Sequence, residues 1–304
     1  MTSRLFVAVA LCLLALTPTA ASATDVPLRV VTFNLLHGGA TSGFTGNDHA
    51  LERRLAIVSR ELRALDPDVV ALQESSIGRA RGNVAARLAA ELGFQYVHAT
   101  TTSRATPFAL LNRLAAFVMD FSEGPAILSR FPIVATEVHD LRHCTKWLDP
   151  RVMLRAEIVT PAGAIDVFST HTSADECQVD RVRAILLAAR GARPALVMGD
   201  LNTAEWSPAL RRLTEGERVV DVFRAANPEA AGPTTWQRID GESPTARRRV
   251  DYILMLRGGR VPGVVRDSRV VLDVPERRAD GTVLWPSDHY GVFARVDLGD
   301  TPLR

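Results

Sequence analysis

Residues 195–202 read ALVMGDLN, a short apolar run that ends in Asp200 and Asn202. An apolar run of this length predicts a buried strand. Side chains two positions apart on a strand share a face, so we expect Asp200 and Asn202 to point together. A buried carboxylate is costly unless it is paired or binds a metal. The end of this strand is therefore a candidate site.

Polar residues follow other apolar runs of the chain in the same way. Taken alone, each is equally well explained as a cap, a turn residue or a surface charge, but their number favours one shared cleft. They are Asn34, Glu74, His171, Asp251 and the tripeptide Ser287-Asp288-His289, at or next to strands expected over residues 28–34, 69–73, 164–170, 195–198, 250–256 and 292–296.

Helical patterns alternate with these strands. Residues 51–65 predict a helix, because aliphatic residues recur at steps of three and four before Asp66-Pro67 ends the pattern. Residues 84–92 and 179–189 have a similar pattern. Strands outnumber helices and many links between strands are short, which favours two mixed sheets packed face to face with helices outside. A doubly wound parallel sheet would need a helical crossover at nearly every link.

The N-terminus of the 304-residue chain is typical of a secretory signal. Arg4 precedes an apolar run over residues 5–16, and Ala21-Ser22-Ala23 offers a small-x-small cleavage pattern. An uncleaved membrane anchor is the alternative, but the flanking residues favour cleavage after Ala23. We therefore expect residues 1–23 to be removed and residues 24–304 to form one secreted domain. The formal net charge of +2 neither supports nor excludes a nucleic-acid partner.

Two cysteines, Cys144 and Cys177, remain after the signal. In an oxidising compartment an even pair predicts a disulfide, with two buried free thiols as the alternative. No Cys-x-x-Cys motif or histidine cluster accompanies them, which argues against a zinc site.

Five motifs occur in the order that is found in the endonuclease/exonuclease/phosphatase superfamily, which the chain resembles. This group includes deoxyribonuclease I, exonuclease III-like repair nucleases, neutral sphingomyelinases and inositol-phosphate phosphatases. The resemblance spans about residues 28–296 and implies a four-layer α/β/β/α sandwich of two mixed sheets, with the site at one end of the sheets. The motifs are Phe33-Asn34, Leu72-Gln73-Glu74, Gly199-Asp200-Leu201-Asn202, Val250-Asp251-Tyr252 and Ser287-Asp288-His289.

The resemblance also implies a metal site. Glu74 is expected to be the main ligand, with Asn34 beside it, while Asp288 serves either the metal or the nucleophile. Oxygen donors of this kind suit Mg²⁺ or Mn²⁺ better than zinc. Such an ion polarises a phosphoryl oxygen and stabilises the charge that develops there.

The remaining matched residues are expected to handle the water and the phosphate. Asp200 orients the attacking water and helps to take its proton, and Asn202 donates to a phosphate oxygen. Asp251 holds His289 in one tautomer. His289 then acts either as a general base or as a cationic clamp on the phosphate, and the sequence does not choose between these roles.

Glu123 and His171 are expected to form a second pair near the leaving-group oxygen. His171 lies where deoxyribonuclease I-like and sphingomyelinase-like members have a catalytic histidine, and Glu123 lies where the former have its carboxylate partner. A solvated turn glutamate is the alternative for Glu123. The segment His37-Gly38-Gly39 either approaches a substrate phosphate or forms a glycine turn.

Two further segments have alternative interpretations. Residues 108–121 are unusually apolar and form either a lipid-facing flap or part of the core, and the periodic recurrence of apolar residues favours the core. The run Arg247-Arg248-Arg249 is expected to be a solvated face, although it could also steer an anionic substrate.

Three functions fit these observations. We favour hydrolysis of a lipid or a small phosphodiester over a secreted nuclease acting on DNA or RNA, because no long basic stripe is found. A non-catalytic module that binds a phosphate ligand is disfavoured, because no matched catalytic position is lost. The expected partner is thus a phosphoester: a phospholipid head group, a small phosphodiester or a nucleic acid. No stable protein partner is implied, and a peripheral membrane contact is compatible with the sequence.

Overall fold

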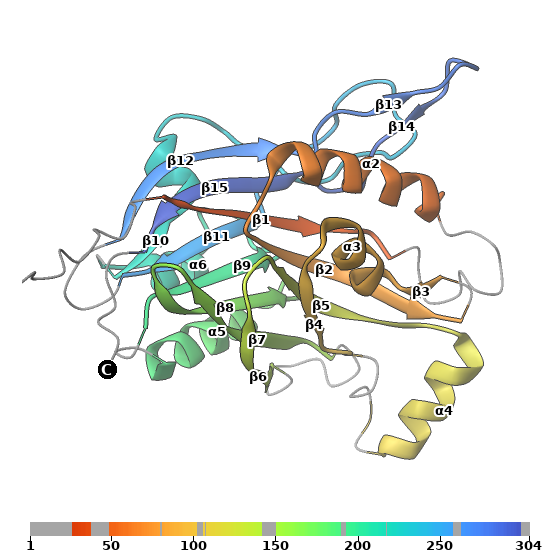
Figure 1. The fold of residues 1–304 in the computed structure, drawn as a ribbon. Helices are drawn as coiled ribbons and strands as arrows, with labels where there is room; N and C mark the ends of the chain where they lie inside the picture. The colour runs from red at the N-terminus through yellow and green to blue at the C-terminus, as the bar shows by residue number, and fades with distance from the viewer. Residues whose placement is uncertain are drawn as a thin grey trace, which may run out of the picture.

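The computed structural model describes residues 26–37, 49–79, 81–101, 106, 108–141, 150–189, 193–216, 218–257 and 263–298. In this part of the chain two large mixed sheets pack face to face, and helices cover their outer faces (Figure 1). The expected four-layer α/β/β/α sandwich is confirmed. The predicted signal over residues 1–23 and Cys144 of the predicted disulfide lie outside the described residues.

The first sheet has seven strands in the order β12-β15-β1-β2-β5-β4, and β3 pairs with β2. At its centre β1 runs parallel to β2 and antiparallel to β15, so strands from the two ends of the domain lie side by side. The strands are β1 (Leu28–Asn34), β2 (Val69–Gly78), β3 (Gly82–Asn83), β4 (Gln95–His98), β5 (Ser122–Ser129), β12 (Val264–Val271) and β15 (Gly291–Asp297).

The second sheet has six strands in the order β10-β11-β9-β8-β7-β6. Strands β8 and β9 are parallel with His171 opposite Asp200, while β9 and β11 are antiparallel with Asp200 opposite Asp251. This register sets the three residues in one row across the sheet. The strands are β6 (Ile133–Asp140), β7 (Val152–Thr160), β8 (Gly163–His171), β9 (Ala195–Asp200), β10 (Val219–Asp221) and β11 (Asp251–Leu256).

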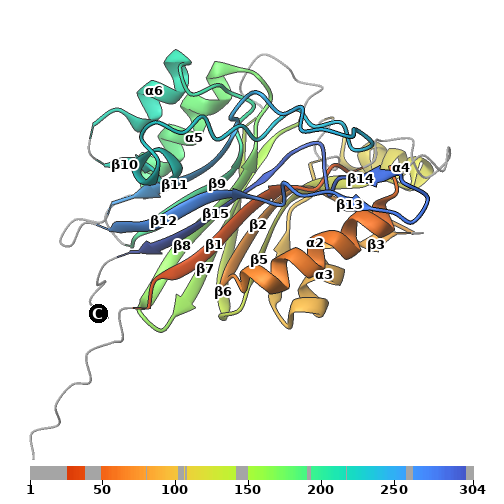
Figure 2. The same ribbon diagram turned by 90° about the horizontal axis from the view of Figure 1, so that it is seen from above.

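Helices lie on the outer faces of both sheets (Figure 2). α2 (Leu51–Leu65) and α3 (Val84–Leu92) cover the first sheet, with the bounds expected from the sequence. α5 (Glu176–Ala189) and α6 (Pro208–Thr214) cover the second sheet, and α5 begins three residues before the expected helix. The short α7 (Val222–Ala226) and the hairpin of β13 (Glu276–Arg277) and β14 (Val283–Leu284) complete the described elements.

Three buried apolar clusters separate the four layers. The middle cluster lies between the sheets, and each outer cluster lies between one sheet and its helices. A strand buried on both faces needs no alternation of apolar and polar residues, which explains the continuous apolar runs of β1, β9 and β11. Representative members are Val30, Ile127 and Met198 in the middle, Phe33, Leu55 and Leu88 under α2 and α3, and Phe168, Val182 and Leu210 under α5 and α6.

Most of the apolar segment of residues 108–121 is exposed, contrary to expectation, and only Phe121 at its end is buried among the large apolar residues of the segment. The segment forms helix α4 (Ala109–Met119), which stands away from both sheets (Figure 1). Leu110 is 81% exposed and Phe117 is 65% exposed. Apolar periodicity predicts a helix with one apolar face, but it does not say whether that face meets the core. Among the described residues, no helix is both long and apolar enough to cross a membrane.

The basic run that precedes β11 is only partly solvated, which corrects the expectation for its last member. Arg247 and Arg248 are exposed, but Arg249 is buried. The Arg249 guanidinium lies 2.7 Å from Asp221 and 2.8 Å from Glu205, which pair with its charge. Arg249 therefore supports the fold beside β11 rather than steering a substrate.

Candidate active site

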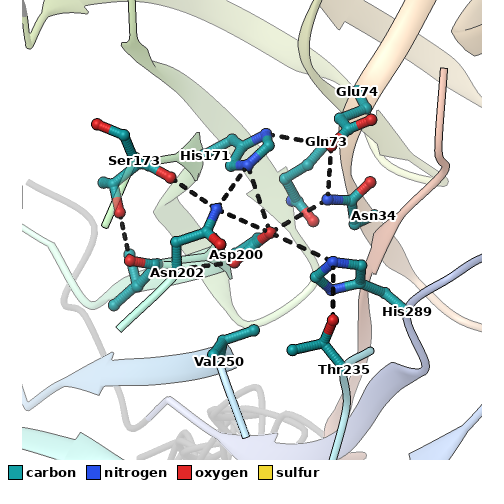
Figure 3. Close-up of polar contacts among 12 residues, drawn as sticks. Asn34, Gln73, Glu74, His171, Ser173, Asp200, Asn202, Thr235, Val250 and His289 are labelled. Atoms are coloured by element: carbon teal, nitrogen blue, oxygen red, sulfur yellow. Dashed lines mark hydrogen bonds and ion pairs between the residues drawn. The ribbon is translucent and has the colours of Figure 1, made fainter. Parts of the chain in front are cut away.

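Side chains from five separate stretches of the chain meet at one end of the two sheets (Figure 3). Strand β1 supplies Asn34, β2 supplies Glu74, and β8 and β9 supply His171 and Asp200. His289 comes from the segment between β14 and β15. All five point toward one another, so the strand ends bring their polar side chains together as expected (Figure 3).

Asp200 lies at the centre of this group and is only 1% exposed. Its Oδ2 is 3.1 Å from Asn34 Nδ2, and its Oδ1 accepts the backbone N–H of Asn202 at 2.7 Å. The same Oδ2 lies 3.3 Å from His171 Nε2 and 3.8 Å from His289 Nε2. Burial raises the pKa of Asp200 to about 7, so this carboxyl group can exchange a proton near neutral pH.

Asp200 and Asn202 do lie together, but strand alternation is not the reason. Strand β9 ends at Asp200, and Asn202 adopts a left-handed conformation with φ of 47°. The turn brings Asn202 Nδ2 within 3.3 Å of Asp200 Oδ2 and within 2.9 Å of His171 Nε2. The Asn202 amide thus links the carboxylate of Asp200 to the ring of His171.

His289 is held between two carboxylates. Its Nδ1 lies 2.9 Å from Asp251 Oδ2, and its Nε2 lies 3.2 Å from the hydroxyl of Thr235. Burial lowers the pKa of His289, but the charges of Asp251 and Asp200 outweigh it and raise the pKa to about 10. The ring is therefore protonated at neutral pH, and it is a hydrogen-bond donor at both nitrogens.

Glu74 reaches the site through an irregularity in β2. Its φ is 52°, and the register between β2 and β5 shifts between Leu72 and Ser75. A bulge of this kind re-aims a side chain and is common beside functional sites. Glu74 Oε1 accepts from Asn34 Nδ2 at 3.2 Å, and Glu74 Oε2 lies 3.3 Å from His37 Nε2.

Glu74 is ionised despite its burial. Burial raises its pKa, but His171, His37 and the hydrogen bonds from Asn34 and the His37 backbone lower it to about 2. Burial and the charge of Arg151 lower the pKa of His171 to about 3, so the His171 ring is neutral near pH 7. At that pH the hydrogen bonds from Asn34 and the His37 backbone therefore stabilise the negative charge of Glu74.

The expected contact between Glu123 and His171 is not formed. Glu123 accepts a hydrogen bond from the hydroxyl of Thr101 at 3.0 Å, because the segment that follows β4 runs beside β5 and the backbone N–H of Thr101 donates to the Glu123 carbonyl oxygen. His171 instead faces Asp200 at 3.3 Å and Glu74 at 3.9 Å. Glu123 still borders the site, since burial and then the charge of Glu74 raise its pKa.

The donors around Glu74 fit a hard divalent cation. Burial raises the pKa of Asp288, and the charge of Glu74 also raises it, so the two carboxylates act on one another electrostatically. Asn34 lies beside Glu74, with its Nδ2 3.2 Å from Glu74 Oε1, while its Oδ1 accepts the Leu36 N–H at 3.1 Å. Carboxylate oxygens are the donors that Mg²⁺ or Mn²⁺ prefers, and a turn of the Asn34 side chain would add an amide oxygen to them.

A second group of potential ligands consists of Asp200, Asp251 and His289. Each offers one ligand atom, and these atoms all lie within 4.8 Å of one another. His289 Nδ1, however, already faces Asp251 at 2.9 Å, and its Nε2 lies 3.2 Å from the Thr235 hydroxyl. A metal at this group would have to replace one of these contacts, which makes the group around Glu74 the better candidate.

Sequence reasoning missed three residues that support the site. Thr235 contacts His289 from a loop, and Arg151 lies close enough to lower the pKa of His171. Arg54 of α2 is 1% exposed and donates to the carbonyl oxygens of Leu35 at 2.5 Å and Pro286 at 3.2 Å. Arg54 thus ties the segment after Asn34 to the segment before Asp288. On a helix of alternating charged and apolar residues, nothing in the sequence distinguished Arg54 from solvated arginines.

The sequence model of the Endonuclease/Exonuclease/phosphatase family matches residues 31–289. The chain belongs to this family. Members of the Endonuclease/Exonuclease/phosphatase family hydrolyse phosphoesters, and the five residues of the site, from Asn34 to His289, lie within the matched residues. A search of the curated proteins found no match.

Solved structures of the family have the same fold. An endonuclease/exonuclease/phosphatase from Beutenbergia cavernae is 25% identical, with a TM-score of 0.64 over 92% of this chain and 73% of that chain. A mannosyl-6-phosphatase from Bacteroides thetaiotaomicron is 16% identical, with a TM-score of 0.66 over 88% and 99%. TDP2 from D. rerio, complexed with a single-strand DNA product, is 17% identical, with a TM-score of 0.64 over 90% and 100%.

Proposed function

We propose that the chain is a secreted, divalent-metal-dependent hydrolase that cleaves a phosphodiester in a lipid or a small molecule. One observation carries this proposal: Asn34, Glu74, His171, Asp200 and His289 converge from distant stretches of a phosphoesterase fold into one buried polar cluster. Isolated buried charges destabilise a fold, so a cluster of this size is best explained by catalysis.

The cation would be held by Glu74 and Asn34, with Asp288 as a further ligand. It would supply charge stabilisation at a phosphoryl oxygen as negative charge develops there. The low pKa of Glu74 keeps this carboxylate ionised, and therefore ready to bind, across the whole neutral range.

Water activation is assigned to Asp200. Its pKa of about 7 makes the carboxylate a balanced proton acceptor at neutral pH. Its Oδ1 accepts from the Asn202 backbone at 2.7 Å and its Oδ2 accepts from Asn34 at 3.1 Å, so the carboxylate is held in one orientation from which it can position the water for in-line attack.

His289 is assigned the role of a cationic clamp on the phosphate rather than that of a base. With a pKa raised to about 10, the ring already carries its proton at neutral pH and cannot accept another. Asp251 keeps Nδ1 occupied at 2.9 Å, so Nε2 is the nitrogen that can donate to a phosphoryl oxygen. The side-chain amide of Asn202 is a second donor of this kind.

Export is proposed from the sequence of residues 1–23, with cleavage after Ala23. The same compartment would allow the disulfide between Cys144 and Cys177. A peptide map of the exported protein under non-reducing conditions should show the two cysteines in one linked fragment. Two freely alkylated cysteines would contradict the pairing.

The test uses residues 24–304 with Mg²⁺, with Mn²⁺ and with EDTA. The substrates are sphingomyelin, lysophosphatidylcholine, bis(p-nitrophenyl) phosphate and supercoiled plasmid. We expect turnover of a lipid or the small diester that EDTA abolishes. Plasmid nicking without turnover of any lipid or small diester would show a nuclease instead.

Two variants test the assignment of the site. Asp200→Ala and His289→Ala should each lower turnover by about 10³-fold, the scale of losing a positioned acid-base group or a charge-stabilising donor. Asp240→Ala is the matched control, because Asp240 is exposed and its partner is Arg238 at 3.2 Å on the surface. Unchanged turnover in the Asp200 or His289 variant, with the fold intact, would reject the assignment.

A further inference from the structure

Helix α4 exposes its apolar side chains to solvent. Those that are exposed share one face: with 3.6 residues per turn they lie within an arc of ~120°. A patch of this kind on a soluble domain marks a contact with another apolar surface. The exposed members are Leu110, Leu111, Leu114, Phe117 and Val118.

The opposite face of α4 carries a buried polar residue. Asn112 is the buried residue of this helix, and its side chain donates to the carbonyl oxygen of Thr106 at 2.8 Å and accepts the Thr106 N–H at 2.9 Å. In a helix that packs on a core the arrangement is the reverse, with apolar residues inward and polar residues outward. The large apolar side chains of α4 are thus on the face that is turned to solvent.

The charge that α4 itself carries is positive. α4 contains Arg113 and no acidic residue, and Arg113 is exposed. The Arg79 guanidinium lies 5.1 Å from the centre of the Phe117 ring, but its charge is paired with Asp120 at 3.1 Å. An apolar face beside an exposed arginine complements the anionic surface of a lipid bilayer.

The base of α4 is attached to the active site. Phe121 follows the helix after one residue, and its ring lies 5.0 Å from the ring of His37 in an edge-on contact. His37 in turn lies 3.3 Å from Glu74. α4 projects from the end of the sandwich toward which β1 and β2 run, which is the end that holds the site (Figure 1). A surface bound by α4 would therefore lie beside the catalytic group.

A lipid surface fits α4 better than a second copy of the chain does. One face of a helix ~16 Å long and ~10 Å wide has a footprint on the order of 200 Å². A stable protein interface buries about 800 Å² on each partner. α4 stands away from the sheets, so the rest of the molecule adds little area in the same plane (Figure 1). Insertion into lipid needs no such matching area, because the bilayer adapts to the helix.

We propose that α4 is a membrane-docking helix that inserts its apolar face into an anionic phospholipid surface and thereby brings the active site to phosphodiester head groups. This inference rests on the proposed hydrolase function for its biological purpose, but the docking itself needs no turnover. On this proposal the active site meets its substrate at the lipid surface to which α4 binds.

The test measures flotation of residues 24–304 with vesicles in EDTA, so that catalysis plays no part. The vesicles contain phosphatidylcholine alone or phosphatidylcholine mixed with phosphatidylglycerol. We expect binding to the mixed vesicles and at least tenfold weaker binding of the double variant Leu110→Glu/Leu114→Glu, since burial of one such side chain contributes about a tenfold change. Val264→Glu/Val274→Glu, which adds the same two negative charges at exposed positions outside α4, is the control and should bind as the unaltered protein does.

Arg113→Gln separates charge from apolar insertion. It should weaken binding to the anionic vesicles by about fivefold, from one lost lipid contact. Thermal unfolding of each variant shows that the fold is kept. Failure of the unaltered protein to float, or flotation of the leucine variant at full strength, would overturn the inference. So would sedimentation that finds a dimer which the leucine variant converts to a monomer.

The docking inference and the hydrolase proposal fail separately. A protein that floats but hydrolyses no phosphoester contradicts only the hydrolase. A protein that hydrolyses a soluble diester but does not float contradicts only the docking helix. Asp200→Ala, which removes the water-activating carboxylate, should float as the unaltered protein does, because Asp200 does not touch α4.

Discussion

Replacing Gly199 by alanine should damage the site without touching any catalytic side chain. Gly199 precedes Asp200 in β9, with φ of 154°. A Cβ atom at this position would lie 2.0 Å from the carbonyl oxygen of Thr170 in β8. Real Cβ atoms do not approach an oxygen closer than about 3 Å, so the two strands must separate locally by about 1 Å.

The consequences of this separation follow from where it happens. Thr170 and Gly199 are paired one step before His171 and Asp200, so the shift passes directly to the site. A misplacement of about 1 Å lowers turnover by about 10²-fold. Overpacking between two buried strands costs about 3 kcal/mol, which lowers Tm by roughly 6–12 °C for a domain of this size.

The assay compares Gly199→Ala with Gly93→Ala in turnover of a small phosphodiester and in thermal unfolding. Gly93 also has a positive φ, of 71°, but no atom lies within 4 Å of a Cβ built there. The control should lose about 1 kcal/mol from backbone strain and keep its activity. Equal Tm values and equal turnover in the two variants would refute the reasoning from the 2.0 Å approach.

Three further variants test the polar network. Arg54→Met should lower the free energy of unfolding, measured in urea, by about 3 kcal/mol, because it leaves several buried carbonyl oxygens without a donor. The control is Arg53→Met, on the exposed side of the same helix, which should change the free energy of unfolding by less than about 0.5 kcal/mol. Asp251→Asn should move the His289 titration, followed by NMR in EDTA, from about pH 10 toward its ordinary value of 6.5. Because the pKa of His289 is raised in the folded state, the protonated ring contributes fully to stability below about pH 6.5, and this contribution is lost as the pH rises through about 10. In Asp251→Asn the loss of stability should come at a lower pH. An unchanged dependence of stability on pH would argue against the pairing of His289 with Asp251. Glu74→Gln should raise the Mg²⁺ concentration needed for half-maximal turnover by at least tenfold. An unchanged Mg²⁺ requirement would show that Glu74 is not a metal ligand.

The sequence alone predicted those helices and strands whose signals lie within one continuous segment of the chain. The bounds of β1, α2 and α3 agree with expectation, because apolar spacing and the adjacent turn residues are local signals. The convergence of strand ends was also predictable, since the residues were polar at positions that must be buried. The four-layer architecture came from the resemblance, because strand counts alone do not determine how sheets pack.

Features that depend on two segments at once were not predictable. The bulge that turns Glu74 into the site arises from the pairing of β2 with β5, and nothing within β2 signals it. The contact of Glu123 with Thr101 likewise needs the path of the chain after β4. The exposure of α4 reverses the usual meaning of apolar periodicity, because Asn112 and not a leucine is the buried residue of the helix.

The pairing of β1 with β15 sets the order of events during synthesis. Leu28 lies opposite Val296, so this pairing closes a loop of roughly 260 residues, at an entropic cost of about 5 kcal/mol. The ribosome must release nearly the whole polypeptide before β15 can settle between β1 and β12 and bring His289 to Asp200. A nascent chain, however well folded its first half, therefore has no working catalytic centre, and the cell that makes the protein is not exposed to its activity until translation ends.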